Sequence, residues 1–170
     1  MKILSKQTAT IIPVTFEKPT KEDSSAMWNL VNESTLDQNS PYKYMMMADF
    51  FTETCIVAKQ DEELVGFVTA FIQPERPDTL FIWQVGVDAS QRGKGLASKM
   101  ISELIKWNAT EVHYLEATVT PSNEASRALF KKLGNKLNAE CEITDHFSAS
   151  LFPDSSHEKE QLFRIGPFKL

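Results

Sequence analysis

The sequence has little that would let the chain bind a polyanion or enter a membrane. Its 18 lysines and arginines are outnumbered by 23 acidic residues, which gives a formal net charge of −5, and no basic stripe is present. Nucleic-acid binding requires clustered positive charge, so we expect no nucleic-acid partner. The longest apolar run, at residues 45–48, is far too short to span a bilayer, and the N-terminus lacks the apolar block of a signal peptide. We therefore expect a cytoplasmic protein with no membrane partner.

Cysteine and histidine are also scarce. The two cysteines, Cys55 and Cys141, lie in apolar or mixed sequence. This favours buried thiols over a disulfide in a reducing compartment, with a catalytic cysteine as the minor alternative. No group of His, Cys, Asp and Glu has the spacing of a metal site, so no metal is expected.

What the chain does contain is enough apolar sequence for one core. With 170 residues, 42% hydrophobic and 24% charged, it is typical of a single globular domain, here 1–170 with a core at about 11–166. Apolar periodicity and turn residues predict alternating strands and helices, hence an α/β (α+β) fold with a mixed sheet covered by helices on both faces. The expected strands are 11–16, 55–59, 64–72, 79–87, 114–119, 139–147 and 162–165; the expected helices run from about 20 to 35, from 44 to 51, and after Gly95 and Asn123, with 37–44 as an irregular loop.

A glycine-punctuated turn follows the strand that ends at Val87. Gly93 and Gly95 permit backbone angles at which successive N–H groups converge on one point, and the amphipathic helix that follows directs its positive dipole end to the same place. Arg92 and Lys94 add positive charge. The turn therefore predicts an anion site, although an ordinary strand-to-helix loop has the same glycine pattern.

Two segments carry a family resemblance. Arg92-x-x-Gly95-x-Ala97 resembles the pyrophosphate-binding motif of the GNAT superfamily of acetyltransferases, and Asn123 followed by Leu129-Phe130-x-x-x-Gly134 resembles a second motif of that family, whose asparagine bonds the pantetheine arm. Taken alone, Asn123 is better interpreted as a helix N-cap than as a ligand. The resemblance implies the GNAT acyl-CoA N-acyltransferase fold and acetyl-CoA as co-substrate. The implied cofactor-binding residues are Val85, Val87, Arg92, Gly93, Lys94, Gly95, Leu96, Ala97, Asn123 and Phe130.

Further blocks narrow this resemblance. The diaminobutyrate acetyltransferases of ectoine biosynthesis are similar to this sequence in residues 36–44, 49–55, 66–68, 74, 77–81, 83–85 and 145–147, and the similarity spans roughly residues 14–165. That family implies acetyl transfer to the γ-amino group of L-2,4-diaminobutyrate, and a homodimer. Two alternatives stay open: a GNAT enzyme for another small primary amine, and a non-catalytic module that binds CoA.

The reaction sets requirements for the catalytic residues. An amine with a pKa of about 10 must lose a proton before it attacks, and the developing oxyanion needs a fixed donor. The resemblance implies the backbone N–H near Val85 as that donor, with Val87 along the pantetheine. Phe130 stands where many GNAT enzymes have a tyrosine acid, so Tyr42 and Tyr44 are the first alternatives, unless they are core aromatics.

At the substrate end, carboxylates and amides are expected to bind the ammonium groups. Asp37 and Asn39 are candidate anchors, and Glu158, beside His157, is a candidate anchor or base; Asp37 in a turn cap and Glu158 as a solvated charge are the plainer interpretations. Trp83 is either an apolar wall beside the acetyl group or a core residue.

Overall fold

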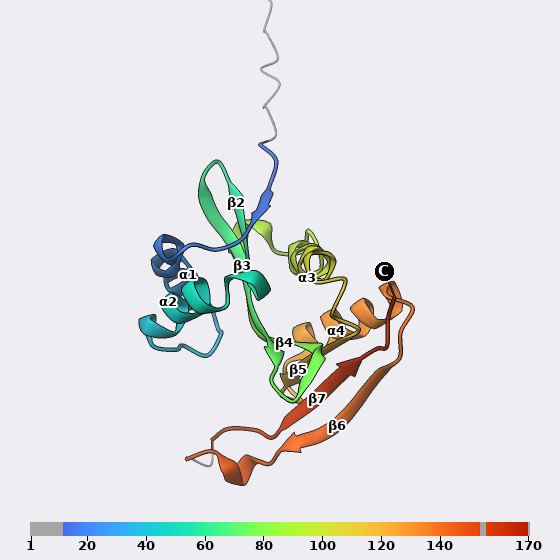
Figure 1. Ribbon diagram of the computed structural model, residues 1–170. Helices are drawn as coiled ribbons and strands as arrows, with labels where there is room; N and C mark the ends of the chain where they lie inside the picture. Colours follow the sequence, from blue (N-terminus) through green and yellow to red (C-terminus); the bar gives the residue numbers. More distant parts are fainter. Residues whose placement is uncertain (1–11, 154–155, 170) are drawn as a thin grey trace, which may run out of the picture.

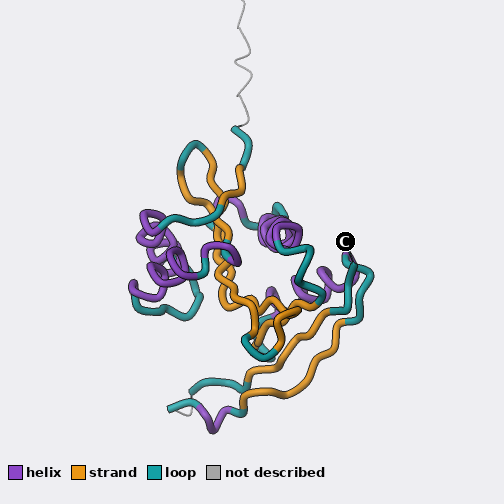
Figure 2. Tube along the Cα trace, viewed as in Figure 1, coloured by secondary structure: helices purple, strands orange, loops and turns teal. Residues whose placement is uncertain are grey.

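The computed structural model describes residues 12–153 and 156–169. In this part of the chain a single mixed sheet has the strand order β1-β2-β3-β4-β5-β7-β6, in which β4 and β5 are parallel and the other neighbours antiparallel (Figures 1 and 2). The mixed sheet confirms the expected α/β fold. Its strands are β1 Thr15–Glu17, β2 Ile56–Gln60, β3 Glu63–Gln73, β4 Arg76–Val87, β5 Tyr114–Val119, β6 Cys141–Phe147 and β7 Glu160–Ile165.

Helices cover both faces, as the apolar periodicity predicts. Figure 1 shows α1 (Ser24–Asn32) and α2 (Pro41–Phe50) on one side of the sheet, and α3 (Leu96–Trp107) and α4 (Glu124–Lys136) on the other. Each layer has its own apolar cluster. The α1 and α2 cluster contains Met27, Leu30, Val31, Tyr44, Val57 and Phe67, whereas the larger cluster under α3 and α4 includes Met100, Ile101, Leu104, Leu133 and Phe163.

The region before β2 differs in part from expectation. The backbone N–H of Thr20 donates to the Asp23 carboxylate over 2.8 Å, and a short 3₁₀ helix at Lys21–Asp23 leads into α1. Residues 37–44 were expected to be irregular, but α2 begins at Pro41. The reason is local: the Ser40 hydroxyl accepts from the Tyr42 N–H over 3.1 Å, and proline suits the first helical position.

β4 contains a bulge next to the site. Gln84 pairs with Thr69 and Ile82 pairs with Ala70, so Trp83 is an extra residue on β4. A bulge interrupts the alternation of side chains between the two faces of a strand. Ile82 and Val85 consequently pack toward α3 and α4, whereas the Gln84 side chain reaches α2.

β4 and β5 pair over only three residues. Thr79–Phe81 of β4 lie beside Tyr114–Glu116 of β5, and beyond this junction the two strands diverge. Glu116, which is 0% exposed, accepts on one carboxylate oxygen from both Arg76 of β4 and Arg164 of β7. The junction is thereby fixed by a buried ionic cluster, and the separation of the strands above it opens the sheet.

Candidate functional site

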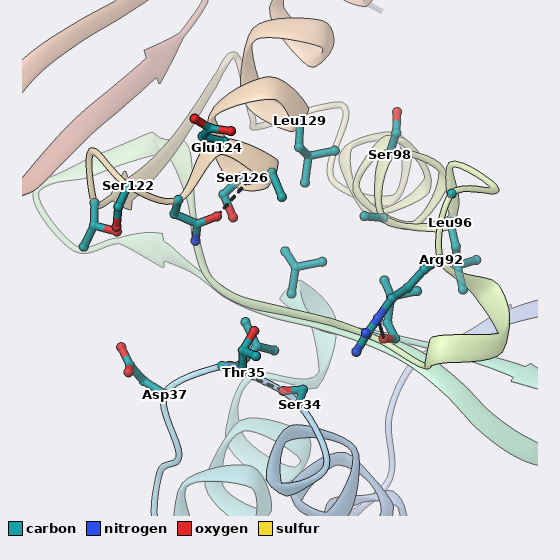
Figure 3. Close-up of a pocket in the computed structure, with 18 of the residues that line it drawn as sticks. Ser34, Thr35, Asp37, Arg92, Leu96, Ser98, Ser122, Glu124, Ser126 and Leu129 are labelled. Atoms are coloured by element: carbon teal, nitrogen blue, oxygen red, sulfur yellow. Dashed lines mark hydrogen bonds between the residues drawn. The ribbon is translucent and has the colours of Figure 1, made fainter.

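A cleft of about 1160 Å³ lies where β4 and β5 separate. This exceeds the roughly 300–1,000 Å³ of pockets for drug-sized ligands, so the cleft has room for a coenzyme together with a second, small molecule. Figure 3 shows side chains from several segments around this space. The cleft is lined by 34–37 of the loop after α1, Val85 and Val87 of β4, 91–93 and 95–98 of the turn and α3, Thr120, 122–126, Leu129 and Lys132 at α4, and 156–158 before β7.

The glycine turn forms one wall of the cleft. Gly93 and Gly95 have φ angles of 73° and 74°, in the left-handed region that favours glycine, and Gly95 immediately precedes the first residue of α3. Arg92 lines the cleft, and its Nε donates to the Val87 carbonyl over 3.4 Å. Lys94 lies between the two glycines but is outside the lining residues. This wall combines free N–H groups, a helix dipole and a guanidinium, which together bind anions.

A second helix begins on the opposite wall. The Asn123 side-chain oxygen accepts from the Ser126 N–H over 3.0 Å and caps α4, and both residues line the cleft. Capping uses the oxygen of Asn123 and leaves its amide NH₂ as a donor. The cap role and the predicted ligand role are therefore compatible.

Acidic residues gather at another part of the cleft. Asp37 and Glu158 both line it, and the Ser122 hydroxyl donates to the Glu158 carboxylate. His157 stacks on Phe152 with ring centroids 3.7 Å apart, and its Nδ1 lies 2.6 Å from the Glu158 carbonyl oxygen. These contacts hold 157–158 in a defined position along the cleft.

Glu160 was missed by the sequence analysis. Burial raises the pKa of its carboxyl, the negative charges of Asp37 and Glu158 act in the same direction, and His157, whose Nε2 lies 3.8 Å from the Glu160 carboxylate, opposes them. Its position was not predictable, because only the fold brings β7 next to the loop that follows α1. Asp37 and Glu158, which line the cleft, thus lie near a third carboxyl group, that of Glu160, an arrangement that suits a cationic ligand.

Several candidates lie outside the lining residues. Tyr42 is 63% exposed on the first turn of α2, and Trp83 is 48% exposed at the bulge, on the α2 side of β4. Tyr44, for which a core position was one of the two alternatives, lies on α2 and is 0% exposed, with its ring against that of Phe67. Asn39 donates from its side chain to the Asp37 carbonyl over 3.3 Å. A substrate contact by these residues stays a prediction.

Phe130 also lies outside the lining residues. It is 4% exposed, and its ring centroid lies 6.2 Å from that of Phe163. The preceding residue, Leu129, lines the cleft instead. Helical periodicity explains the difference, because consecutive residues of α4 point in directions about 100° apart.

A buried polar network behind β4 was also missed. Gln84 Oε1 accepts from Lys43 Nζ over 3.0 Å and from the Tyr44 hydroxyl over 2.8 Å. Gln84 Nε2 donates to the Asp37 carbonyl over 3.0 Å. Burial lowers the pKa of Lys43 to about 8. A glutamine inside an apolar strand was the available signal in the sequence, since a buried amide requires partners.

The described residues contain no group of three or more His, Cys, Asp and Glu side chains that would hold a metal ion. Within the same ranges, no helix is long and apolar enough to cross a membrane. Both cysteines are free thiols, with Cys55 buried and Cys141 half-buried.

Two features together indicate the class of protein: the sheet opens between β4 and β5, and a glycine turn precedes α3. The family model of the acetyltransferase (GNAT) family matches residues 24–134, and the chain belongs to this family. Within it, the chain is 59% identical over 97% of its length to the L-2,4-diaminobutyric acid acetyltransferase of Halalkalibacterium halodurans, covering 91% of that protein. It is 62% identical to the enzyme of the same name from Marinococcus halophilus, with 91% of each chain covered.

A solved structure extends the comparison to the fold. The diaminobutyrate acetyltransferase EctA from Paenibacillus lautus, solved in complex with L-2,4-diaminobutyric acid and coenzyme A, is 40% identical, with a TM-score of 0.88 over 94% of this chain and 98% of that one. The chain is thus a member of the diaminobutyrate acetyltransferase family.

Proposed function

We propose that the chain transfers the acetyl group of acetyl-CoA to the γ-amino group of L-2,4-diaminobutyrate, giving N-γ-acetyl-L-2,4-diaminobutyrate in ectoine biosynthesis. The observation that carries this proposal is the cleft itself, which joins an anion-binding turn to a group of carboxylates. The high identity to diaminobutyrate acetyltransferases over almost the whole chain supports the same substrate pair.

Acetyl-CoA occupies the wall formed by the turn and the two helix N-termini. The N–H groups of 93–97 and the side chains of Arg92 and Lys94 bind the pyrophosphate, and the amide of Asn123 bonds the pantetheine arm. Strand β4 has no β5 partner beyond Phe81, so its main chain near Val85 and Val87 is open to a ligand on that side. Phe130 contributes as an apolar residue beneath this wall rather than as a polar ligand.

The chemistry requires one proton acceptor and one oxyanion donor. A carboxylate takes a proton from the γ-ammonium group, the neutral amine attacks the thioester carbonyl, and the Val85 N–H stabilises the oxyanion. The C–S bond then breaks and the coenzyme leaves as a thiolate, while the nitrogen, which gained a positive charge on attack, gives its extra proton to this thiolate, so that a neutral amide and a thiol are the products. A thiol pKa of about 8.5 makes this thiolate an acceptable leaving group, so the absence of a hydroxyl on Phe130 is tolerated. Tyr42 stays the alternative acid.

Glu158 is the proposed proton acceptor and Asp37 the proposed anchor for the α-ammonium. Both carboxylates line the cleft, and the Ser122 hydroxyl orients Glu158. His157 supports this end of the cleft through its contact with the Glu158 carbonyl. Asn39, Tyr44 and Trp83 complete the proposed substrate end, with Asn39 and Tyr44 acting through their contacts with Asp37 and Gln84.

We also propose a cytoplasmic homodimer. The free thiols of Cys55 and Cys141 support a reducing compartment. Exposed apolar side chains on and beside α2, namely Met45, Phe50 and Trp83, support association of two copies. Sedimentation equilibrium tests this, with a monomer at micromolar concentration contradicting it.

The test of the activity is thiol release from acetyl-CoA with L-2,4-diaminobutyrate, ornithine, lysine and putrescine, and assignment of the acetylated nitrogen by mass spectrometry. We expect a strong preference for diaminobutyrate at its γ-nitrogen. Turnover of another amine alone would overturn the substrate, and CoA binding without turnover would overturn the enzymatic activity.

A further inference from the structure

Gln84 joins three segments that are far apart in the sequence. Its side chain is 9% exposed and contacts Lys43 and Tyr44 of α2 on one side and the main chain of Asp37 on the other. Gln84 itself belongs to the β4 bulge, and the next residue, Val85, lines the cleft. The amide therefore connects α2, β4 and the loop that carries a cleft carboxylate.

Lys43 fixes the direction in which this amide points. An amide oxygen has two lone pairs, and those of Gln84 are both used, by Lys43 Nζ and by the Tyr44 hydroxyl. If the amide were flipped, its NH₂ group would face an ammonium that has no acceptor. The flip is thereby disfavoured, and the NH₂ group stays directed at the Asp37 carbonyl 3.0 Å away.

Other hydrogen bonds tie the Asp37 loop to α1: Trp28 Nε1 donates to the Asn39 carbonyl over 3.2 Å, and Gln38 Nε2 donates to the Asn32 side chain over 2.6 Å. The main chain of the loop lies between α1 and α2, outside regular secondary structure, and the Asp37 carbonyl also accepts from the side chain of its neighbour Asn39 over 3.3 Å. The Gln84 bond is the one that ties this carbonyl to the sheet. Loss of this hydrogen bond removes the tie between the loop and the sheet, so we expect the loop to open more readily without it.

We propose that Gln84, oriented by Lys43, is a positioning residue that holds the Asp37 loop against β4 and so sets the amine end of the cleft. This proposal rests on the proposed function. It assigns no contact between Gln84 and either substrate. Its consequence is that binding of the diamine depends on a side chain behind the strand, whereas binding of acetyl-CoA does not.

The test uses Gln84→Glu. The new carboxylate keeps an acceptor for Lys43 and Tyr44 but has no N–H for the Asp37 carbonyl. Its added negative charge would by itself favour a diammonium substrate, so the expected loss of affinity has the opposite sign from a charge effect. Gln60→Glu is the matched control, because Gln60 also accepts a side-chain hydrogen bond, from Gln91, and donates to a carbonyl, that of Ile12, away from the amine end.

Two measurements separate the proposed positioning role of Gln84 from the proposed enzymatic activity. Hydrogen exchange of the peptide covering 34–40 should be faster in Gln84→Glu and unchanged in Gln60→Glu, whatever the enzyme acetylates. The KM for diaminobutyrate should rise about tenfold, as expected for one lost hydrogen bond, with the KM for acetyl-CoA changed less than twofold. Unchanged exchange, an unchanged diamine KM, or equal rises in both KM values would overturn the proposal.

A second variant, Tyr44→Phe, tests the same proposal if Gln84→Glu does not fold. Tyr44→Phe keeps the ring that packs against Phe67 and removes one donor to Gln84. Hydrogen exchange of 34–40 should become faster and the KM for diaminobutyrate should rise, each by a smaller factor than in Gln84→Glu. No change in either quantity would overturn the positioning role of Gln84. If the wild-type protein acetylates only another amine, the proposed substrate is wrong. The positioning role of Gln84 is then tested by the hydrogen-exchange result and by the KM for that other amine.

Discussion

The ammonium nitrogen of Lys43 lies 3.9 Å from the centroid of the Trp83 ring and 3.0 Å from the side-chain oxygen of Gln84. A lysine that is only 8% exposed is thus held between α2 and the β4 bulge by an aromatic face and a neutral amide, without a carboxylate partner. Cation–π contact and one hydrogen bond replace only part of the hydration that the ammonium loses.

This environment predicts a pH-dependent stability. The folded protein releases the Lys43 proton at about pH 8, whereas the unfolded chain keeps it up to 10.5. Between these values the unfolded state binds more protons, so the free energy of unfolding rises with pH, by roughly 2 kcal/mol from pH 7 to 9.5. Burial raises the pKa of the neighbouring Cys55 thiol to about 12 and also raises that of the Tyr44 hydroxyl, so both stay neutral for most of this range.

Urea denaturation of wild type and Lys43→Met at several pH values measures this effect. The variant should lack the rise. Lys106→Met is the control, because Lys106 is an exposed residue of α3 paired with Glu103, and its slope should match that of wild type. Parallel curves for wild type and Lys43→Met would contradict the pKa assignment.

Asp37→Asn tests the substrate anchor. Replacing the carboxylate by an isosteric amide removes a charge-assisted contact and should raise the KM for diaminobutyrate about 10- to 100-fold, with little change in the KM for acetyl-CoA. Asp61→Asn serves as the control: Asp61 lies in the turn between β2 and β3 at a φ of 52°, which asparagine accepts readily. A normal diamine KM in Asp37→Asn would remove Asp37 from the substrate site.

Glu158→Gln tests the proton acceptor. General-base catalysis typically contributes 10²- to 10⁴-fold, so kcat should fall by about that factor, and the loss should shrink at high pH, where more of the amine is neutral. Ser122→Ala, which removes the hydroxyl that donates to Glu158, should cost only a few-fold. Glu142→Gln, an exposed change on β6, should have no effect. A kcat within threefold of wild type would assign the base elsewhere.

Glycine substitutions separate cofactor binding from folding. An added Cβ at Gly95 meets nothing within 4 Å, so Gly95→Ala strains only a left-handed turn, and it should raise the KM for acetyl-CoA. At Gly86 an added Cβ would meet the Phe67 ring at 2.4 Å and Leu30 at 2.9 Å. Gly86→Ala should therefore destabilise the fold by about 1–3 kcal/mol. Thermal unfolding and steady-state kinetics on both variants check these expectations. A destabilised Gly95→Ala with a normal KM for acetyl-CoA, or a stable Gly86→Ala with a raised KM, would refute them.

The elements with strong local signals could be predicted from the sequence. Strands β2 to β5 and helices α3 and α4 lie within a few residues of their expected ranges, because their apolar periodicity agrees with their burial. The first expected strand, 11–16, differs more: β1 runs Thr15–Glu17, and residue 11 lies outside the described residues. The start of α2 was predicted three residues too late, at residue 44 instead of Pro41, although Ser40-Pro41 is a helix start signal.

The site likewise has one part that could be predicted from the sequence and one part that could not. The cofactor wall depends on consecutive residues after β4, so a local pattern predicts it. The acidic end depends on strand order, which places β7 beside β5 and brings Glu160 near Asp37. The bulge at Trp83 decides which neighbours face the cleft, and a one-residue change in register leaves no clear mark in a sequence.

Because β4 and β5 are joined over only three residues, a small rotation at this junction would produce a larger displacement at the far end of β4. Val87 lies six residues beyond Phe81, which is about 20 Å along a strand, so a rotation of only about 3° at the junction moves the far end of β4 by roughly 1 Å. Displacements of that size in an active site reduce rates by about 100-fold. The two arginines that bind Glu116 hold β4 and β5 together at this junction, so the angle at which β4 enters the cleft depends on contacts made outside the residues that line it.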